Sequence, residues 1–178
     1  YQWSNGIGLD STRVSPLFPT TYKVTVTGNN GCKAVEEVFV DTKPLPTPSI
    51  NGFSKVCIGD SVTLTASGAS AYLWQSGGQG NSETFIVNSP TNFSVTGIGS
   101  NGCSANASFS VAIDTLPHVD AGANQNLCSG DTATLTANGA LTYDWSNNAN
   151  TQTTLVSPSS STTYFVYGTD VNGCTGVD

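Results

Sequence analysis

The sequence predicts an all-β protein, a row of small antiparallel β-sandwiches arranged like beads on a string. Three observations support this prediction: a repeat with a period of 71 residues, short segments in which apolar and polar residues alternate, and no helical pattern of useful length. Alternation at every second residue indicates a strand with one buried face, and a period of this length indicates an array of similar folding units.

The repeat is fixed by residues that keep one spacing without insertions. Trp3, Trp74 and Trp145 lie 71 residues apart. The cysteines keep the same interval in two series, one with Cys32, Cys103 and Cys174, each preceded by Asn-Gly, and one with Cys57 and Cys128. We therefore expect three units: residues 1–47, the C-terminal part of a repeat whose first strands are missing, residues 48–118, a complete repeat, and residues 119–178, a repeat that lacks its last strand.

The complete repeat carries signals for about seven short strands, the number expected of a small sandwich. Ser61–Ala66 alternates polar and apolar residues, as a half-buried strand does. Ser100-Asn101-Gly102 is a hairpin signal, because Asn and Gly tolerate the positive φ that tight hairpins require. The strand that follows the hairpin should place alternate residues on one face, namely Cys103, Ala105, Ala107, Phe109 and Val111.

The aromatic residues that recur at equivalent positions are interpreted as core. They form three Tyr-x-Trp pairs, made of Tyr1 and Trp3, Tyr72 and Trp74, and Tyr143 and Trp145. Residues two apart on a strand point to the same face, so each pair should enter the interior of its sandwich together. Val62 and Leu64 are the expected neighbours of Trp74, and Ala133 and Leu135 those of Trp145.

The connections between repeats are rich in proline. Thr42–Pro48 contains three prolines, and Pro117 has the register of Pro46. Proline stiffens a linker and prevents strand pairing across it, so short and semi-rigid joints are expected. The chain contains no Met and its first residues align with the middle of a repeat, which suggests that it is a window on a longer polypeptide.

Charge and hydropathy exclude two classes of partner. Charged residues make up 10% of the chain, against roughly 25% in ordinary domains, and the net charge is −7. An acidic surface repels phosphate backbones, so nucleic-acid binding is not expected. No apolar run approaches the roughly 20 residues of a membrane span, so no span is expected in this segment.

The cysteine spacing predicts one disulfide within each repeat. Cys57 and Cys103 are 46 residues apart, and so are Cys128 and Cys174. We expect the bridges Cys57–Cys103 and Cys128–Cys174, each tying loops at one end of its sandwich, and a partner for Cys32 upstream of Tyr1. Metal ligation by thiolates is the alternative, but these cysteines are isolated and the chain has a single His. Persistent disulfides indicate an extracellular or cell-surface location.

The sequence contains few of the residues that catalysis or cofactor binding would need. The only His is His118, which lies in a linker beside Pro117, so a nucleophile with a histidine base is not available and no enzymatic activity is expected. No cofactor is expected. Ca²⁺ between repeats is the weaker alternative, with Asp114 and Asp120 as candidate oxygen ligands.

The repeated motif resembles a known family. Cys57-Ile58-Gly59-Asp60 followed by Leu64, Ala66 and Gly68, and the corresponding Cys128-Ser129-Gly130-Asp131 followed by Leu135, Ala137 and Gly139, are similar to the Ig-like or PKD-like repeats of large Bacteroidota surface proteins. The resemblance implies Ig-like sandwiches and export by the type IX system, in proteins of the adhesin or gliding-motility type. It identifies no ligand.

The same resemblance implies a modification. Bacteroidota attach O-glycans at a short sequon that begins with Asp and Ser or Thr, and four sites match it, with acceptors Ser11, Ser61, Thr115 and Thr132. The alternative for Ser61 and Thr132 is structural, because the preceding Gly-Asp makes the turn before a strand. A bulky sugar would shield strand edges from pairing with neighbours.

Three functions remain open from the sequence. The first is a stalk or spacer of a giant secreted surface protein, whose partners are the neighbouring repeats and whose cell-surface or glycan ligand lies elsewhere in the protein. The second is a subunit segment of an oligomeric fibre or hook used for attachment or predation, with identical chains as partners. The third is an Ig-like module that itself binds a glycan or partner.

Overall fold

The computed structural model describes residues 1–178 and contains fifteen β-strands and no helix, which confirms the all-β prediction. Residues 1–47 form β1 Gln2–Trp3, β2 Thr20–Thr27 and β3 Lys33–Val40. Residues 48–118 form β4 Ser49–Asn51, β5 Lys55–Cys57, β6 Ser61–Ser67, β7 Ala71–Trp74, β8 Ser82–Ile86, β9 Thr91–Ile98 and β10 Ser104–Asp114. Residues 119–178 form β11 Ala133–Thr136, β12 Thr142–Trp145, β13 Thr153–Val156, β14 Val166–Thr169 and β15 Thr175–Val177.

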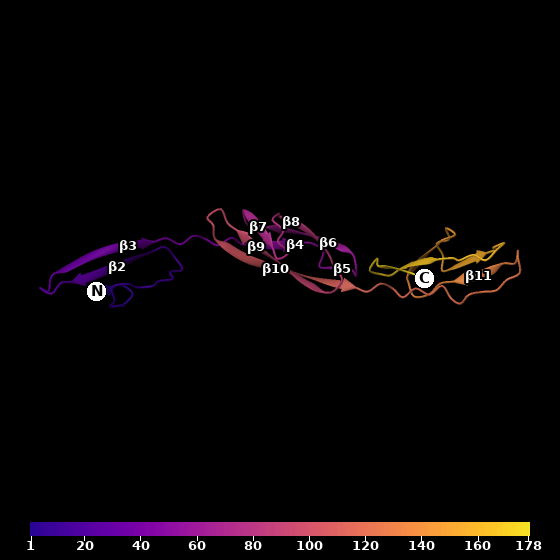
Figure 1. The fold of residues 1–178 in the computed structure, drawn as a ribbon, viewed down its shortest axis with the longest axis horizontal. Helices are drawn as coiled ribbons and strands as arrows, with labels where there is room; N and C mark the ends of the chain where they lie inside the picture. Colours follow the sequence, from indigo (N-terminus) through magenta and orange to yellow (C-terminus); the bar gives the residue numbers. More distant parts are fainter.

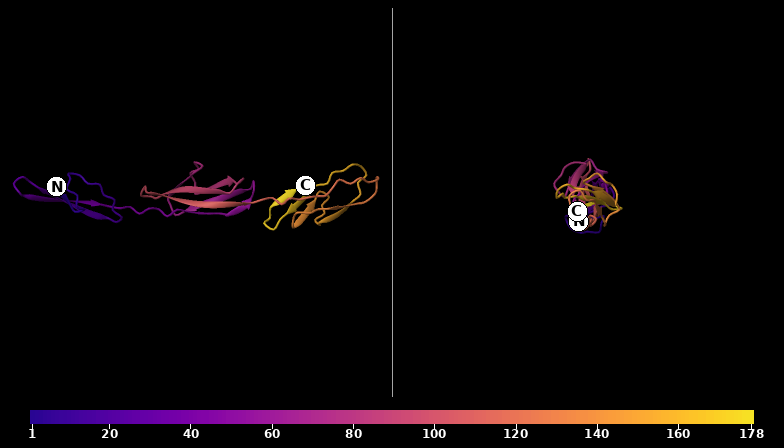
Figure 2. Two further views of the ribbon diagram at one scale, coloured as in Figure 1. Left: turned by 90° about the horizontal axis from the view of Figure 1, so that it is seen from below. Right: turned by 90° about the vertical axis from the view of Figure 1, so that its right-hand side faces the viewer.

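The strands gather into three bodies that follow one another along a single line (Figure 1). A single extended segment of chain joins each body to the next. Seen along the long axis, the three bodies superpose within one compact outline (Figure 2). The molecule is therefore a slender rod of repeats rather than a globule.

The second repeat is a sandwich of two sheets. One sheet has the order β4-β6-β8 and the other the order β5-β10-β9-β7. The pairs are antiparallel with one exception, because β5 runs parallel to the end of β10, with Cys57 opposite Asp114. The count of seven strands agrees with the sequence, whereas the parallel pair was not anticipated.

The alternation of polar and apolar residues along the strands determines which side chains of this repeat are buried. Along β6 the apolar residues Val62, Leu64 and Ala66 are buried and the Ser and Thr residues between them are exposed. Along β10 the odd-numbered residues from Ala105 to Val111 face inward, as the hairpin signal predicted. Trp74 is 1% exposed and shares the core with Val62 and Leu64, which confirms its expected neighbours.

Two side-chain hydrogen bonds recur with the repeat. The indole N–H of Trp74 donates to the carbonyl oxygen of Gly80 at 2.9 Å, and that of Trp145 donates to Thr151 at 3.0 Å. The Tyr72 hydroxyl donates to Ala69, and the Tyr143 hydroxyl to Ala140, in both cases at 2.9 Å. Each of these aromatic side chains thus packs its ring in the core while its N–H or O–H group donates a hydrogen bond, as is usual for buried Trp and Tyr.

The third repeat has a smaller core. Its sheets are β11-β13 and β12-β14-β15. Its buried cluster has five residues, against nine in the second repeat, and includes Trp145 at 2% and Tyr143 at 9% exposure. Leu135 is only partly buried against this cluster, although its counterpart Leu64 is completely buried. The predicted neighbours of Trp145 are therefore present but less tightly enclosed.

The first 47 residues form a single sheet of order β1-β2-β3. No second sheet faces it, so the prediction of a buried Tyr1 and Trp3 is wrong in part. Tyr1 is 60% exposed and Trp3 is half-buried, although the Trp3 indole N–H still donates to Leu9 six residues on. Val35 and Phe39 on β3 are exposed as well; their counterparts one repeat on, Asn106 and Ser110, also point outward from the sandwich.

Trp74 offers a direct test of the core. Trp74→Ala should lower the free energy of unfolding of the second repeat by about 3–5 kcal/mol, because it removes a large buried ring and leaves a cavity. Chemical denaturation measures the change. Trp3→Ala is the matched control and should cost much less, because Trp3 is only half-buried; equal losses for the two variants would contradict the assignment of Trp74 to the core.

Candidate functional site at the repeat junction

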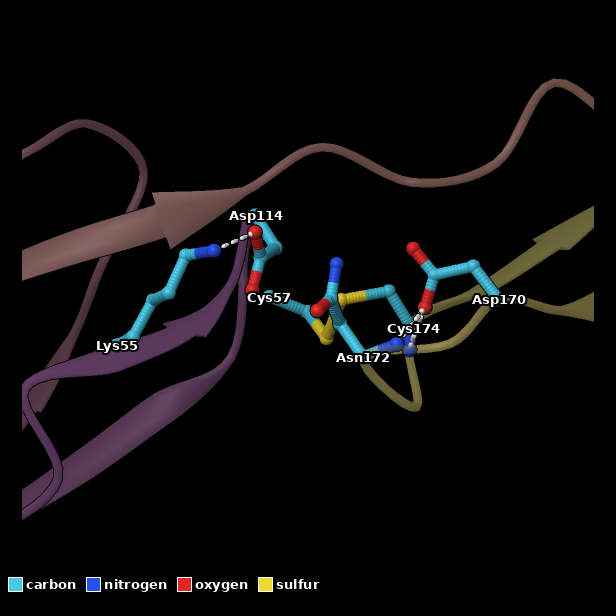
Figure 3. Close-up of polar contacts among 6 residues, drawn as sticks. All are labelled: Lys55, Cys57, Asp114, Asp170, Asn172 and Cys174. Atoms are coloured by element: carbon cyan, nitrogen blue, oxygen red, sulfur yellow. Dashed lines mark hydrogen bonds and ion pairs between the residues drawn. A yellow bond between two sulfur atoms is a disulfide. The ribbon is translucent and has the colours of Figure 1, made fainter.

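The feature that stands apart from ordinary packing is a disulfide between consecutive repeats. Cys57 of the second repeat is bonded to Cys174 of the third, across a sequence separation of 117 residues and with Cα atoms 5.6 Å apart. Figure 3 shows the bond crossing from the last residue of β5 to the loop before β15. Cys32, Cys103 and Cys128 are free.

This pairing corrects the predicted bridges Cys57–Cys103 and Cys128–Cys174. Cys57 lies opposite Asp114, the last residue of β10, whereas Cys103 lies immediately before the first residue of that strand. Eleven residues of strand span about 35 Å, and a disulfide requires Cα atoms within about 7 Å. The two cysteines of one repeat therefore lie at opposite ends of the sandwich, and the bond forms with the next repeat instead.

The Cys57 side of the junction is held by backbone hydrogen bonds. The amide of Ile58 donates to the Asp114 carbonyl, and that of Asp60 donates to Cys57 at 3.0 Å, which closes a tight turn. Gly59 in this turn has φ +89°, a conformation that residues with a Cβ adopt only with strain. The turn thus presents Cys57 at the end of β10.

The Cys174 side is organised by one carboxylate. Asp170 Oδ1 accepts hydrogen bonds from the amides of Asn172, at 2.8 Å, and Cys174, at 2.9 Å (Figure 3). The Asp170 amide in turn donates to the Cys174 carbonyl at 2.9 Å. Cys174 is 1% exposed, so the bond is shielded from solvent on this side.

An ion pair supports the same end of the second repeat. The Lys55 ammonium contacts the Asp114 carboxylate across the parallel pair of β5 and β10 (Figure 3). The Asp114 side chain is 18% exposed and that of Lys55 is 53% exposed. The contact ties the strand that leads into the linker to the strand that leads into Cys57.

The linker itself is seated on the third repeat. Val119 is buried in the core of that repeat, and the carbonyl of His118 lies directly against Gly139, where an added Cβ would overlap it. Gly176 approaches the Pro117 carbonyl in the same way. Only Thr115 and Leu116 therefore separate the end of β10 from chain that is already packed on the next repeat.

The linker between the first and second repeats makes the same close contact with a glycine of the following repeat. Gly68 stands against the Thr47 carbonyl as Gly139 stands against His118. The hairpin that ends at Cys103 reaches back to the linker, where the Asn101 side-chain amide donates to Pro44 at 2.8 Å. Cys103 is thus at the same place in its junction as Cys174 is in the next one.

Sequence reasoning missed Asp170, and a signal for it was present. In the first two hairpins this position is Gly28 and Gly99, and an Asn side chain caps the cysteine amide: Asn30 caps Cys32, and Asn101 caps Cys103. Only the third hairpin has Asp at this position. The upstream partner predicted for Cys32 stays a prediction.

The remaining predicted site residues are the candidate glycan acceptors, the candidate Ca²⁺ ligands and His118. The four candidate O-glycan acceptors, Ser11, Ser61, Thr115 and Thr132, are all exposed, and their modification stays a prediction. Of the candidate Ca²⁺ ligands, Asp114 is paired with Lys55, and Asp120 accepts the Gly122 amide at 2.8 Å. No three His, Cys, Asp or Glu side chains converge on one point. His118 is exposed in the linker. No helix in the chain could cross a bilayer.

Comparison with known proteins gives only distant likenesses. No family model matches the chain, and no curated protein matches it. Among solved structures, one from work on host cell surface retention of a 1.5-MDa bacterial ice-binding adhesin is 14% identical, with a TM-score of 0.33, over 88% of this chain and 70% of that one. A Bacteroides ovatus surface protein of a mixed-linkage glucan utilization locus, SGBP-B, in complex with a heptasaccharide is 20% identical, with a TM-score of 0.24 over 98% of this chain. The match spans 56% of that protein. TM-scores of this size describe only a distant likeness and assign no function.

The pairing of the cysteines is open to direct measurement. Proteolysis of the oxidised protein without reductant should release one disulfide-linked pair of peptides, containing Cys57 and Cys174. Cys174→Ser should lower stability by about 2–5 kcal/mol, the usual cost of losing a native disulfide, whereas Cys103→Ser should have little effect. A linked pair containing Cys57 and Cys103 would overturn the assignment.

Substitution of two glycines tests the close contact between the linker and the third repeat. Gly139 and Gly130 both have φ +91°, so alanine at either position should cost about 1–2 kcal/mol in backbone strain. Gly139→Ala should cost more, because its Cβ would displace the His118 carbonyl, whereas Gly130 has no other atom within 4 Å. Denaturation of the two variants, with protease cleavage at 115–118 as a local probe, measures the difference; equal stability and equal cleavage would argue against a seated linker.

Proposed function

We propose that this chain is a load-bearing stalk segment of a secreted cell-surface protein, which holds a distal binding part away from the cell. The observation that carries the proposal is the disulfide between Cys57 and Cys174, because it joins consecutive repeats of a linear row. A bond within one repeat would stabilise that repeat alone. A bond between repeats fixes how the units follow one another.

The bond changes the path of mechanical force. Tension applied to the two ends of the chain passes from the first repeat to Cys57, across the disulfide, and from Cys174 to the C-terminal residues. Residues 58–173 carry no load along the backbone, because the disulfide bypasses them. A stalk built in this way keeps its length under pulling forces, even when a sandwich inside the bypassed segment opens.

Two connections at one junction also restrict rotation. The peptide linker and the disulfide leave the second repeat at the same end, since Cys57 lies opposite Asp114. A single flexible linker permits bending and twisting, whereas two attachment points oppose both. The seats of Val119 and His118 on the third repeat shorten the flexible part further.

The chemistry of the bond and of the surface suits this role. A disulfide persists in an oxidising compartment, which supports an extracellular site of action. Export by the type IX system, an adhesin role and O-glycans at exposed Ser and Thr residues remain predictions from the family resemblance.

Assembly with identical chains is the second candidate. The exposed side chains of β3 support it, since Val35 is 55% and Phe39 63% exposed on the face of β3 that points away from the core in the complete repeat. Exposed apolar patches of this kind mark contact surfaces. Direct glycan binding has less support, because Trp74 and Trp145, the side chains suited to stacking on sugar rings, are in the cores. Sedimentation of the isolated chain as an oligomer would favour assembly over a single-stranded stalk.

Single-molecule stretching tests the load path. With handles at Tyr1 and Asp178, reduction should lengthen the fully extended chain by about 400 Å, the contour length of the 117 residues that the disulfide spans. Cys103→Ser should show the same gain on reduction, and Cys174→Ser should show the long extension without reductant. An oxidised wild-type chain that already extends over all its residues would exclude a load-bearing bridge.

A further inference from the structure

Two local structures form the disulfide between repeats, and both occur again elsewhere in the chain. One is the Cys-x-Gly-Asp turn, which presents Cys57 in the second repeat and recurs as Cys128–Asp131 in the third. The other is the Asn-Gly-Cys hairpin, which presents Cys174 and recurs at Cys32 and Cys103. The bond in the structure therefore joins one turn to one hairpin, while a second turn and two further hairpins carry thiols.

The two turns have the same backbone geometry. In each, the amide of the Asp donates to the carbonyl of the cysteine three residues before it, at 3.0 Å for both Cys57 and Cys128. The glycine between them has φ +89° in the first turn and +91° in the second. The Ser157 hydroxyl donates to the Asp131 carbonyl at 3.1 Å and holds the second turn against the third repeat. Cys128 is exposed, so its thiol is presented to the exterior in the same kind of turn as Cys57.

The three hairpins also share one geometry. The amide four residues before each cysteine donates to the cysteine carbonyl, at 2.8 Å for Cys32 and Cys103 and at 2.9 Å for Cys174. The glycine that precedes each cysteine has φ between +79° and +84°. A side-chain oxygen of the hairpin accepts the cysteine amide in all three. Cys32 and Cys103 are therefore held in the loop conformation in which Cys174 forms its bond.

The turn and the hairpin lie at opposite ends of a repeat, which gives the row a direction. Cys103 directly precedes the first residue of β10, whereas Cys57 lies opposite Asp114, the last residue of that strand. A repeat thus presents its hairpin toward the preceding repeat and its turn toward the following one. Figure 1 shows the hairpin between β2 and β3, which contains Cys32, at one tip of the rod. The segment that leads into β11, which contains Cys128, turns back at the opposite tip.

We propose that the turn and the hairpin are complementary halves of one coupling site, and that the Cys128 turn binds the Asn-Gly-Cys hairpin of another repeat and forms a disulfide with it. The junction of Cys57 with Cys174 shows the geometry of this contact, with the hairpin of one repeat set end to end against the turn of the other. Cys103 is the opposite half, which accepts the turn of a preceding repeat. Pairs of two turns or two hairpins are excluded, because they would reverse the direction of the row.

The coupling makes an array of such repeats resistant to cutting. The bond between Cys57 and Cys174 spans 117 residues, whereas the repeat is 71 residues long, so consecutive bonds of this kind overlap by 46 residues. Every peptide bond of a continuing array is then bridged by at least one disulfide, and a single cut of the backbone does not separate its two ends. For Cys32 the same rule places the partner 117 residues upstream. The coupling does not depend on the proposed load-bearing role, which stretching tests separately.

Formation of the bond is a two-electron oxidation, and a small disulfide such as oxidised glutathione is a suitable oxidant. The Cys128 thiolate attacks one sulfur of oxidised glutathione and expels a glutathione thiolate. The thiolate of the hairpin cysteine then attacks the Cys128 sulfur of this mixed disulfide and expels the second glutathione. The two protein thiols lose two protons and two electrons, and one oxidised glutathione becomes two reduced molecules.

Oxidation of the chain at high protein concentration tests the coupling, because a second copy supplies the hairpin with Cys32. In a glutathione buffer the chain should form linear multimers linked from Cys128 to Cys32, both of which are exposed. Random collision of the two thiols gives no more mixed links than the two kinds of like link together, whatever their reactivities. Coupling should raise this ratio by about 10-fold or more, because docking raises the local concentration of the matching sulfur. Peptide mapping without reductant measures the ratio.

Three variants keep both thiols and alter the structures around them. Gly130→Ala strains the turn of Cys128, and Asn30→Ala removes the acceptor of the Cys32 amide, so each should lower the ratio toward the random value. Gly77→Ala is the matched control, since Gly77 has φ +95° and no other atom within 4 Å but lies in the second repeat, away from both thiols; its ratio should equal that of the wild type.

Four results would overturn the coupling site. They are the absence of links between chains, a wild-type ratio of mixed to like links no higher than the random value, no decrease in either Gly130→Ala or Asn30→Ala, and an equal decrease in Gly77→Ala. None of these results bears on the bond between Cys57 and Cys174 within the chain, so the load path and the coupling site can fail separately.

Discussion

The second and third repeats are joined twice at one place, by the peptide chain and by the disulfide between Cys57 and Cys174, and this double connection fixes how the third repeat follows the second. The parallel pairing of β5 with the end of β10 brings the two connections together. Without it, Cys57 would lie away from the linker, and a bond to the next repeat would require that repeat to fold back alongside. The ion pair of Lys55 with Asp114 holds the two strands at this point.

Because the repeats are small, connections between them contribute to the stability of each repeat. A sandwich of about 70 residues buries little more than about 60% of its unfolded surface and is marginally stable by itself. The core cluster of the second repeat has nine buried apolar residues. The third repeat is tied to its neighbour through the buried Val119 of the linker and through Cys174. Stability and mechanical continuity are properties of the array more than of one unit.

The two junctions are built on the same sequence framework. Both linkers rest against a glycine of the following repeat, Gly68 or Gly139, where no other residue leaves room for the carbonyl. The hairpin reaches the linker in both. A carboxylate replaces glycine only in the third hairpin, where Asp170 holds the loop through two backbone amides. The framework therefore sets the position of the junction, and Asp170 organises the loop that carries Cys174.

The sequence by itself determined the strands, the repeat and the central core residues, because these follow from local alternation and from periodic aromatic positions. It identified Trp74 and Trp145 as core and located the hairpin before Cys103. It could not place Tyr1, whose burial requires an opposing sheet. Nor could it pair the cysteines, since a constant spacing of 46 residues fits a bond within a repeat as well as an offset of one repeat. That choice depends on the end of the sandwich at which each cysteine lies. The end is set by how far each strand runs: β7 and β8 have four and five residues, whereas β9 and β10 have eight and eleven. Only the tertiary structure fixes these lengths, because strand pairing and the closure of the core decide where each strand stops.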